Sequence, residues 1–381
     1  MQAERTLGLL RLATGLSLIL ALVNHLLPPK PFALTQLMFD YSQGLTRRGL
    51  VGELSQLVLG AEISHAEAFF LAAFVTLIGA LSFYLFLVRV LPAEMISGWL
   101  LVILALNSFA FASFVGNVGY LDGLLLALTL LAISLPVTLA GLVLRALLVV
   151  AGVMIHENML PYFTLLIGFD LWQRRGNARF GAAIALMPVM LGLLALFVLV
   201  GFSKLDVNSA EAFAAGLEAR ADFWLDPTAL EVSGRGISGN LALMAELRGT
   251  TKYWAWVLFD GVPLLAMSLW LIWLSARLLD TPFGRVLAAL VILAPLSLNL
   301  IAFDVVRFGA ASVLVGFVVI ALLLRDSEPA RRLFPRLFGW PHMLVLLVLN
   351  VNIFTIQVNI GAFHVGQFPW VLLTQLKWLV P

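Results

Sequence analysis

The amino-acid sequence predicts an all-α polytopic membrane protein, and two observations carry this prediction. Hydrophobic residues make up 62% of the 381 positions and charged residues only 12%, which is more apolar than a soluble chain with one hydrophobic core. The apolar residues also gather in runs of about 20 residues, the length of an α-helix that spans the hydrocarbon layer. We expect residues 1–381 to form a single membrane domain.

The composition also excludes several classes of function. The sequence contains no cysteine, so it offers no disulfide, no thiolate nucleophile and no thiolate metal site. Its formal net charge of +2 leaves no broad basic surface for a nucleic acid. It has no Walker loop, no Rossmann glycine pattern and no Ser-His-Asp elbow, so we do not expect nucleotide hydrolysis to drive this protein.

Eleven apolar runs are candidates for spanning helices. The first follows a basic N-terminus, as in a signal peptide, but it lacks a small-residue cleavage site and is long, so we interpret it as a retained span. Three short helices joined by tight turns are expected within 121–173, where proline interrupts the pattern. The eleven predicted spans lie near residues 7–27, 67–91, 95–115, 121–137, 139–156, 158–173, 180–202, 254–276, 284–303, 307–324 and 341–362.

Basic residues in the short loops predict the orientation, because such loops carry Lys and Arg on the cytoplasmic side. The N-terminus is then cytoplasmic, and the long loops 28–66 and 203–253 are extracytoplasmic. The final segment, 368–380, is too short to cross comfortably, and its two Trp and one Lys favour a helix that lies in the interface. The basic residues that define the cytoplasmic ends are Arg5, Arg89, Arg174, Arg175, Arg179, Arg277, Arg285, Arg325, Arg331, Arg332 and Arg336.

This topology gathers the unusual polar residues at the extracytoplasmic end of the bundle. They come from the first long loop and from the ends of spans that are far apart in the sequence. Nothing in the rule for orientation requires them to lie at the same end of the bundle. Charged residues at one level of a membrane protein are typical of a shared polar site. The residues are His25, Asp40, Arg47, Arg48, Asp122, His156, Glu157, Asp304 and Arg307.

The stretch 39–54, FDYSQGLTRRGLVGEL, carries the densest polar pattern. Asp40 is a candidate general base, and the guanidinium groups of Arg47 and Arg48 are suited to phosphate or pyrophosphate oxygens. In the alternative interpretation, this is an interfacial loop whose arginines bind lipid headgroups or pair with Asp40 and Glu53.

Two acidic segments near the ends of later spans are further candidates. Asp122 opens a predicted helix, so it is either a helix-end acid stabilised by free amides or a second acid or ligand of the site. His156 and Glu157 stand side by side in IHENMLP and do not form HExxH, because position 160 is leucine. Both can face one ligand only if the helix breaks there, which the following proline favours.

Asp304 and Arg307 lie one helical turn apart, so they can form an i,i+3 ion pair or contribute to a phosphate site. The loop 203–253 is predicted to contain two helices, SAEAFAAGLEARADFWL and SGNLALMAELR, separated by a turn-rich segment. This loop either caps a cavity or contacts an acceptor, or it fills space without a chemical role.

The layout resembles the GT-C glycosyltransferases, in which a first span leads to a long extracytoplasmic loop with a catalytic acid and membrane-lying helices. The matching features are the span 7–27, Asp40 and the amphipathic run Leu50–Leu59. The resemblance implies a sugar donor on polyprenyl phosphate or pyrophosphate and an inverting transfer, with Asp40 as base and Arg47 or Arg48 on the departing phosphate. No DxD or ExD pair accompanies Asp40, so a divalent cation is only a possible cofactor and no metal ligand is predicted.

The chain is also similar to the O-antigen polymerase and ligase group, which rely on arginine and histidine. That resemblance implies roles for Arg47, Arg48, His156 and Arg307. Together these resemblances predict a glycosyltransferase of cell-surface polysaccharide in the bacterial inner membrane. They assign Asp40, His156 and Glu157 to catalysis and place Arg47, Arg48, Arg307, Asp122 and Asp304 in the donor site. Its partners would be the lipid-linked donor, a glycan or lipid-linked acceptor, and membrane lipids. The alternative is a transporter or flippase of a lipid-linked anion, for which a midplane site is expected.

Overall fold

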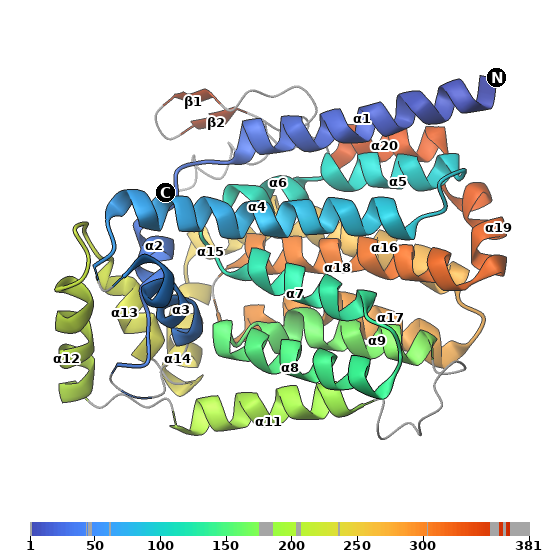
Figure 1. The fold of residues 1–381 in the computed structure, drawn as a ribbon. Helices are drawn as coiled ribbons and strands as arrows, with labels where there is room; N and C mark the ends of the chain where they lie inside the picture. The colour runs from blue at the N-terminus through green and yellow to red at the C-terminus, as the bar shows by residue number, and fades with distance from the viewer. Residues whose placement is uncertain are drawn as a thin grey trace. The chain divides into compact units, whose positions relative to one another are not determined.

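The computed structural model in Figure 1 is helical almost throughout the part of the chain that it describes. Strands β1 (Val358–Ile360) and β2 (Phe363–Val365) form a short antiparallel pair, in which Asn359 is opposite His364. The prediction of an all-α protein is therefore confirmed for the bulk of the chain. The described residues are 2–42, 44, 48–60, 62–174, 186–202, 207–234, 237–302, 304–350, 358–360 and 363–365.

Five helices among the described residues are long and apolar enough to cross a membrane, by length and composition. The structure is thus that of an all-helical chain suited to several membrane crossings. The larger number of eleven spans stays a prediction, because the other apolar helices have only 10 to 17 residues. The five candidates are Glu4–His25, His65–Val90, Thr251–Leu278, Pro282–Leu300 and Val305–Asp326.

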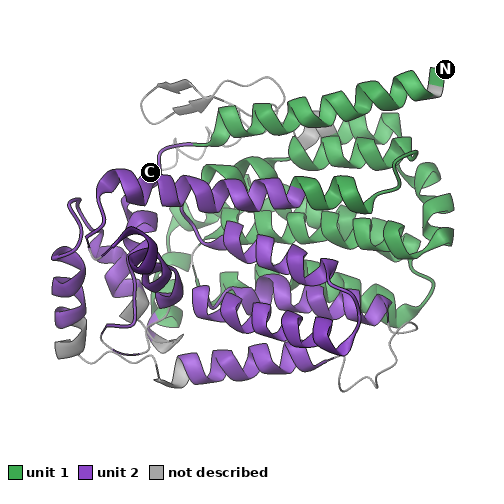
Figure 2. Ribbon diagram, viewed as in Figure 1, with its two compact units in different colours: residues 1–26, 84–116, 240–381 green, residues 27–83, 117–239 purple. Residues whose placement is uncertain are grey.

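The chain divides into two compact units, which Figure 2 colours separately. Unit 1 comprises residues 1–26, 84–116 and 240–381, and unit 2 comprises residues 27–83 and 117–239. Helix α4 (His65–Val90) contributes residues to both.

Unit 1 is built on α18 (Val305–Asp326), whose residues Phe308–Leu324 are all buried. Glycines at 309 and 316, two turns apart, let Leu264 and Leu271 of α16 approach its backbone closely. Ser312 completes the contact, because its hydroxyl lies 2.8 Å from that of Ser268 and donates to the carbonyl of Ile292. The helices of unit 1 are α1 (Gln2–His25), α5 (Ile96–Leu106), α6 (Phe109–Gly116), α14 (Ile237–Arg248, from residue 240), α15 (Thr251–Trp256), η3 (Val257–Gly261), α16 (Val262–Leu278), α17 (Pro282–Leu293), η4 (Ala294–Leu300), α18, α19 (Glu328–Leu337) and α20 (Trp340–Asn350).

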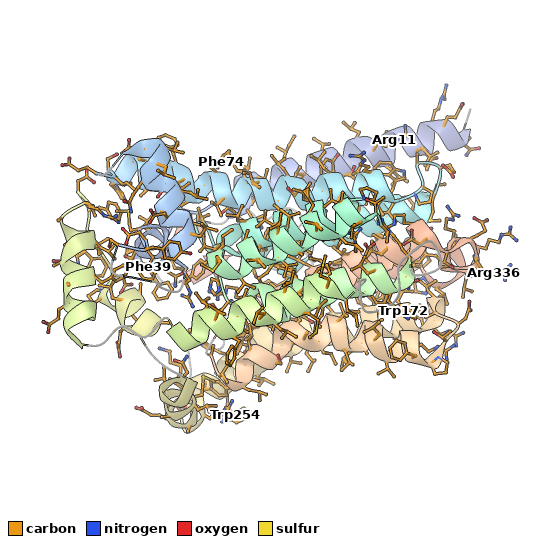
Figure 3. The ribbon with its side chains drawn as sticks, turned by 60° about the horizontal axis from the view of Figure 1, so that its bottom comes forward. Arg11, Phe39, Phe74, Trp172, Trp254 and Arg336 are labelled. Atoms are coloured by element: carbon orange, nitrogen blue, oxygen red, sulfur yellow. The ribbon has the colours of Figure 1, made fainter. Side chains whose placement is uncertain are left out.

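Unit 2 combines short apolar helices with the two long loops of the sequence. Helix α8 packs on α7 and α11, and α3 packs on α8. Phe74, in the part of α4 that belongs to unit 2, points outward (Figure 3) and is 60% exposed, as a lipid-facing residue would be. Besides the first part of α4, the helices of unit 2 are α2 (Pro31–Leu37), α3 (Gly49–Leu59), α7 (Asp122–Ser134), α8 (Leu139–Ile155), η1 (Leu160–Thr164), α9 (Leu165–Gln173), α11 (Met187–Phe202), α12 (Val207–Glu218) and α13 (Pro227–Gly234).

Several predicted spans are interrupted for identifiable reasons. The run 95–115 is two helices, because Asn107 ends α5 and donates its side-chain amide to Ser17 and to the carbonyl of Ile103. The run 158–173 opens with the π-helical turn η1, which has Pro161 near its start. Of the predicted span 341–362, residues up to Asn350 belong to α20, and residues 351–357, 361 and 362 lie outside the described part of the chain. The predicted interfacial helix 368–380 lies outside the described residues.

The long loops are more helical than the sequence indicated. The amphipathic run Leu50–Leu59 is confirmed as α3, which buries Val51 and Ser55 and exposes Leu57 and Val58. Between the two helices predicted in 203–253, the structure has a third, α13. It begins at Pro227, and the carboxylate of Asp226 accepts a hydrogen bond from the amide of Thr228, as an N-cap does.

Helices α4 and α7 cross at two glycines. A Cβ atom on Gly79 would lie 2.5 Å from the Cα of Gly123, and one on Gly123 would lie 2.7 Å from the carbonyl oxygen of Val75. Backbone atoms cannot retreat as a flexible side chain can. Small residues are therefore required on both helices at this crossing.

We therefore expect Gly79→Ala to destabilise the protein by about 1–3 kcal/mol, as other overpacked contacts do. Thermal unfolding of the purified protein in detergent measures this. Gly15→Ala is the matched control, because a Cβ there meets no atom within 4 Å, and it should be neutral or stabilising by up to about 1 kcal/mol. Equal melting temperatures for Gly79→Ala and the native chain would contradict the close crossing.

Candidate functional site

Asp40 is the most completely enclosed acid of the predicted site. It follows α2 in the loop to α3, and it is 1% exposed. One carboxylate oxygen accepts hydrogen bonds from the amide and hydroxyl of Ser42, at 3.0 and 2.7 Å, and the other accepts from the side-chain amide of Gln56 at 2.7 Å. The second oxygen also accepts from Arg220 in a close ion pair. Asp40 is thus held as a carboxylate by four donors.

These contacts set the acidity of Asp40. Burial raises the pKa of a carboxyl group, but the hydrogen bonds from Ser42 and Gln56 and the Arg220 guanidinium outweigh it and hold the pKa of Asp40 below its ordinary value. A carboxylate with a lowered pKa is a weak base. In the conformation of the structure, Asp40 can orient or stabilise a cation more readily than it can remove a proton.

Arg220 is a residue of the candidate site that sequence reasoning missed. It follows α12 in the loop 203–253, 180 positions from Asp40, and it also donates to the carbonyl of Met38 at 2.9 Å. The one signal in the sequence was a basic residue within the amphipathic run SAEAFAAGLEARADFWL. Nothing in that pattern indicates which acid it meets.

The segment 220–226 binds the first long loop along its length. The amide of Ile63 donates to the carbonyl of Arg220 at 2.9 Å, in an isolated parallel bridge with Ala221. The amide of His65 donates to Asp222 at 2.6 Å, and the amide of Asp226 donates to the hydroxyl of Thr35 at 2.8 Å. The segment 220–226 therefore docks on the loop 28–66 and places Arg220 beside Asp40.

Aromatic packing joins the same two loops nearby. Phe39, which is fully buried and labelled in Figure 3, meets the ring of Phe213 edge-on at 5.5 Å. His65 lies 5.6 Å from the ring of Phe223. These contacts hold the segments before and after Arg220 against the first long loop.

Helix α3 supplies two side chains that bind the segment around Asp40. Gln56 and Glu53 lie three positions apart, so they project from one side of the helix. Gln56 reaches the carboxylate of Asp40, and Glu53 accepts the amide of Tyr41 at 3.2 Å. Burial, together with the charge of Glu53, raises the pKa of Tyr41 to about 12, so its hydroxyl stays protonated. Glycine is required at position 52 of α3, because a Cβ there would lie 2.0 Å from the carbonyl oxygen of Phe39.

The N-terminus of α3 carries a second acid–arginine pair. Arg48 donates from Nε and Nη2 to the two carboxylate oxygens of Glu157, at 3.2 and 2.6 Å. Its backbone is left-handed, with φ of 66°, which is uncommon outside glycine and costs conformational energy. The pairing of Arg48 with Glu157 supplies a reason for this conformation.

His156 and Glu157 lie where the helix breaks between α8 and η1, and the break near Pro161 is as predicted. His156 has an extended backbone with φ of −163°, and η1 starts four residues later. Nδ1 of His156 lies 3.3 Å from a carboxylate oxygen of Glu157 and accepts a hydrogen bond from the amide of Asn158 at 3.1 Å. Since Nδ1 accepts that bond, the neutral imidazole carries its proton on Nε2.

The charges around Glu157 fix its ionisation. Burial works against the carboxylate, but Arg48 and then His156 outweigh it and hold the pKa of Glu157 far below its ordinary value. Glu157 is consequently ionised at every physiological pH. Its side chain is 23% exposed, so it is more accessible than that of Asp40.

The remaining predicted residues are placed separately. Asp122 is the first residue of α7 and is buried, where the free amides of a helix N-terminus stabilise an acid. Asp304 caps α18, accepting the amide of Arg307 at 3.2 Å and pairing with its guanidinium at 3.4 Å, which confirms the i,i+3 pair. Asp304 and Arg307 belong to unit 1, and their part in the donor site stays a prediction. Arg47 lies outside the described residues.

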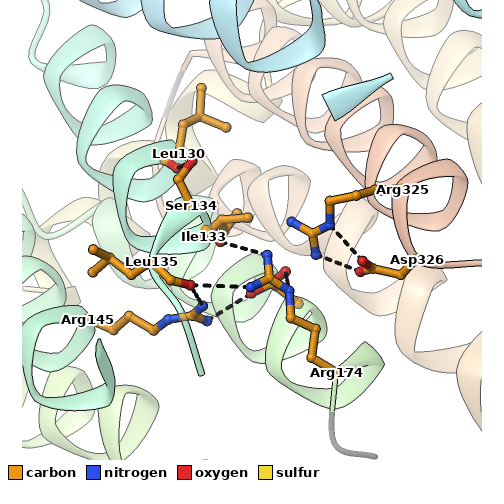
Figure 4. A network of polar contacts seen from close by, with 9 residues as sticks. Leu130, Ile133, Ser134, Leu135, Arg145, Arg174, Arg325 and Asp326 are labelled. Carbon is orange, nitrogen blue, oxygen red and sulfur yellow. Dashed lines mark hydrogen bonds and ion pairs between the residues drawn. The ribbon is translucent and has the colours of Figure 1, made fainter. Parts of the chain in front are cut away.

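A third set of charges is structural. Arg145 and Asp170, with fully buried side chains, pair at 2.8 Å, and Arg174 reaches the other oxygen of Asp170 at 3.1 Å (Figure 4). Both arginines also donate to the carbonyl of Leu135, where α7 ends, and Arg174 donates to that of Ile133. This network ties the ends of α7 and α9 to α8. Figure 4 also draws the Arg325–Asp326 pair of unit 1.

In the described ranges of the chain, no three His, Asp or Glu side chains gather as a metal site would require. The cations that face Asp40 and Glu157 are instead guanidinium groups. Comparisons with protein-family models, curated proteins and solved structures found no match to the chain.

The low pKa values of Asp40 and Glu157 predict acid sensitivity. Carboxylates whose pKa is lowered by folding stabilise the folded state above their unfolded values, near 3.8 and 4.5, and lose that contribution as the pH falls further. We therefore expect the melting temperature of the native chain to be flat from pH 7 to about pH 5 and to fall below about pH 4.5. The Asp40→Asn/Glu157→Gln variant should melt lower at pH 7 and lose less on acidification. Parallel pH profiles for the two proteins would contradict this account.

Proposed function

We propose that this chain is a membrane glycosyltransferase or polysaccharide polymerase. It would use a sugar donor linked to polyprenyl phosphate or pyrophosphate and act at the extracytoplasmic face of the bacterial inner membrane. One observation carries the proposal. Asp40 and Arg48 bracket a single loop of unit 2, and each is paired with an opposite charge that comes from a distant part of the sequence, Arg220 and Glu157.

Such a cluster is costly in a protein this apolar. An isolated buried charge costs several kcal/mol, and even a well-paired one often gives no net gain in stability over apolar residues. Charges that persist in a membrane protein most often serve a ligand or a reaction. A phosphate-linked, membrane-borne donor fits this cluster, because guanidinium groups bind phosphate oxygens with two parallel hydrogen bonds.

In the proposed reaction, Arg48 binds the donor phosphate, with Arg47 and Asp122 as further donor-site residues. The acceptor hydroxyl attacks the anomeric carbon, the bond from that carbon to the phosphate oxygen breaks, and the phosphate leaves with the electron pair. Asp40 or Glu157 takes the hydroxyl proton, and His156 is a further candidate for proton transfer. Asp40 can do so only after it is released from the hydrogen bonds of Ser42 and Gln56 and from Arg220, because these contacts hold its pKa low.

The proposed membrane arrangement follows from the loops. Eleven spans with a cytoplasmic N-terminus would place both long loops outside the cell, in a GT-C-like layout. Helix α3 exposes Leu54, Leu57 and Val58 beside the charged loop, as an interfacial helix would. The donor's apolar chain would then lie in the lipid while its phosphate reaches Arg48.

A transporter or flippase of a lipid-linked anion is the second candidate. It is favoured by the break between α8 and η1 at His156, because transporters bind anions and ions at interrupted helices. The glycosyltransferase remains our proposal, since a transporter would not require a second acid as firmly held as Asp40.

The experiment is transfer of labelled sugar from a polyprenyl-linked pool to glycan in proteoliposomes. We expect Arg48→Ala to lower the rate by about 10²-fold or more, because it removes a charge that stabilises the leaving phosphate. Glu157→Gln and Asp40→Asn separate the two candidate bases, since the true base should lose a similar factor.

Arg332→Ala is the matched control, because this arginine is 79% exposed on α19 and pairs only with Glu328 among the described residues. It should transfer sugar at the native rate. If the native protein moves the lipid-linked sugar across the bilayer but never forms a glycosidic bond, the transporter is correct and the enzyme is not.

A further inference from the structure

We infer that Glu157 occupies the anion site of Arg48 as an internal substitute, and that a phosphate or pyrophosphate group exchanges with it when the ligand binds. This inference rests on the proposed function only in its choice of ligand class. It goes beyond that function by assigning Glu157 a role in the order of binding.

The ion pair of Arg48 with Glu157 has the geometry of an arginine that binds an anion. Arg48 presents Nε and Nη2 to two oxygens of one planar group, at 3.2 and 2.6 Å. Arginine grips a phosphate through the same two-point contact. Whatever binds Arg48 in this way must therefore compete with the carboxylate of Glu157.

The pair is open enough to exchange, unlike the structural charges of unit 2. The side chains of Arg48 and Glu157 are 11% and 23% exposed, whereas those of Arg145 and Asp170 are both 0% exposed. Asp40, the partner of Arg220, is also nearly inaccessible, at 1%. An incoming anion can thus reach Arg48 without opening the core of the unit.

The backbone on the Glu157 side permits movement. Helix α8 ends at Ile155, His156 is extended, and the next helical turn begins at Leu160. Glu157 therefore lies in the connection between two helices, and its side chain can turn away without unwinding either. Arg48 is fixed more firmly, because α3 starts at the next residue and packs against α8.

Two neighbours of Glu157 support exchange over a permanent ion pair. His156 accepts the amide of Asn158 at Nδ1, so while neutral it donates nothing to Glu157 through that atom. The side-chain nitrogen of Asn158, a residue only 6% exposed, has no hydrogen-bond acceptor among the described residues. A buried amide donor of this kind costs free energy unless a partner arrives, and a phosphate oxygen is a suitable acceptor.

Exchange would alter Glu157 as well as bind the ligand. Once Arg48 holds a phosphate, Glu157 loses its main favourable charge contact and its pKa rises toward the ordinary value. The carboxylate becomes a stronger base only after the anion is in place. Anion binding would therefore precede any proton transfer to Glu157.

The test is the affinity of the purified, full-length protein in detergent for inorganic pyrophosphate, measured by calorimetry. We expect Glu157→Gln to bind pyrophosphate about tenfold more tightly than the native chain, because the competing negative charge is gone. Glu328→Gln is the matched control, since this exposed glutamate also pairs with arginine, and it should leave the affinity unchanged. Arg48→Ala should weaken binding at least tenfold, both alone and combined with Glu157→Gln.

Nanodiscs that contain polyprenyl phosphate form the second arm and distinguish a lipid headgroup from a free anion. Tightening by Glu157→Gln in either arm supports exchange. Equal or weaker binding by Glu157→Gln in both arms overturns it. If that variant does not fold, Glu157→Asp replaces it, and its shorter carboxylate should give a smaller tightening, whereas an affinity at or below the native value overturns the inference. These measurements need no sugar transfer. The exchange can therefore be confirmed even if the transferase assay is negative, and it can be refuted even if that assay is positive.

Discussion

The pairing of Asp40, Glu157 and Asp170 with guanidinium groups is the constraint on which the architecture of unit 2 depends. The sequence is 62% hydrophobic, so the interior offers few groups that could solvate an ionised acid. Asp40 is paired with Arg220, Glu157 with Arg48, and Asp170 with Arg145 and Arg174. Removing one partner would leave a buried charge uncompensated, which costs more than the intact pair gains.

These pairs differ in what they join. The Asp170 network ties the ends of α7 and α9 to α8, so it fixes the local fold of these helices, and the side chains of Arg145 and Asp170 are fully buried. The other two pairs join the loop between α2 and α3 to distant segments, one at residue 157 and the other at residue 220. Helix α3 stands between them, with Arg48 at its start and Gln56 near its end. A change at either pair is therefore transmitted to the same helix.

Local features were predictable from the sequence because they depend on neighbouring residues. The amphipathic helix α3, the ion pair of Asp304 with Arg307 and the helix break near Pro161 all follow from spacing or from proline geometry. The helix α13 was missed, because its segment is rich in turn-forming residues and its start depends on one cap, Asp226. The break at Asn107 was also missed, since one polar side chain in an apolar run does not reveal its hydrogen bond to Ser17.

The pairing of arginines with acids far away in the chain could not be predicted from the sequence. Arg220 lies on an amphipathic segment where a solvated arginine is the ordinary expectation, and its contact with Asp40 depends on how two loops dock. Arg145 and its partner Asp170 each stand in an apolar run whose pattern predicts a helix and gives no sign of an ion pair. Which arginine meets which acid is decided by tertiary packing, so residue type alone could not assign it.

The most direct test of this account is a double-mutant cycle on the pair that joins the two long loops. Asp40→Asn, Arg220→Gln and the double variant would be compared with the native chain by unfolding in detergent. We expect a coupling free energy of about 2–3 kcal/mol, because each single variant leaves a charged partner behind. Single effects that add to within about 0.5 kcal/mol would show that the two residues act independently, and the docking of residues 220–226 on the first loop would then have to be abandoned.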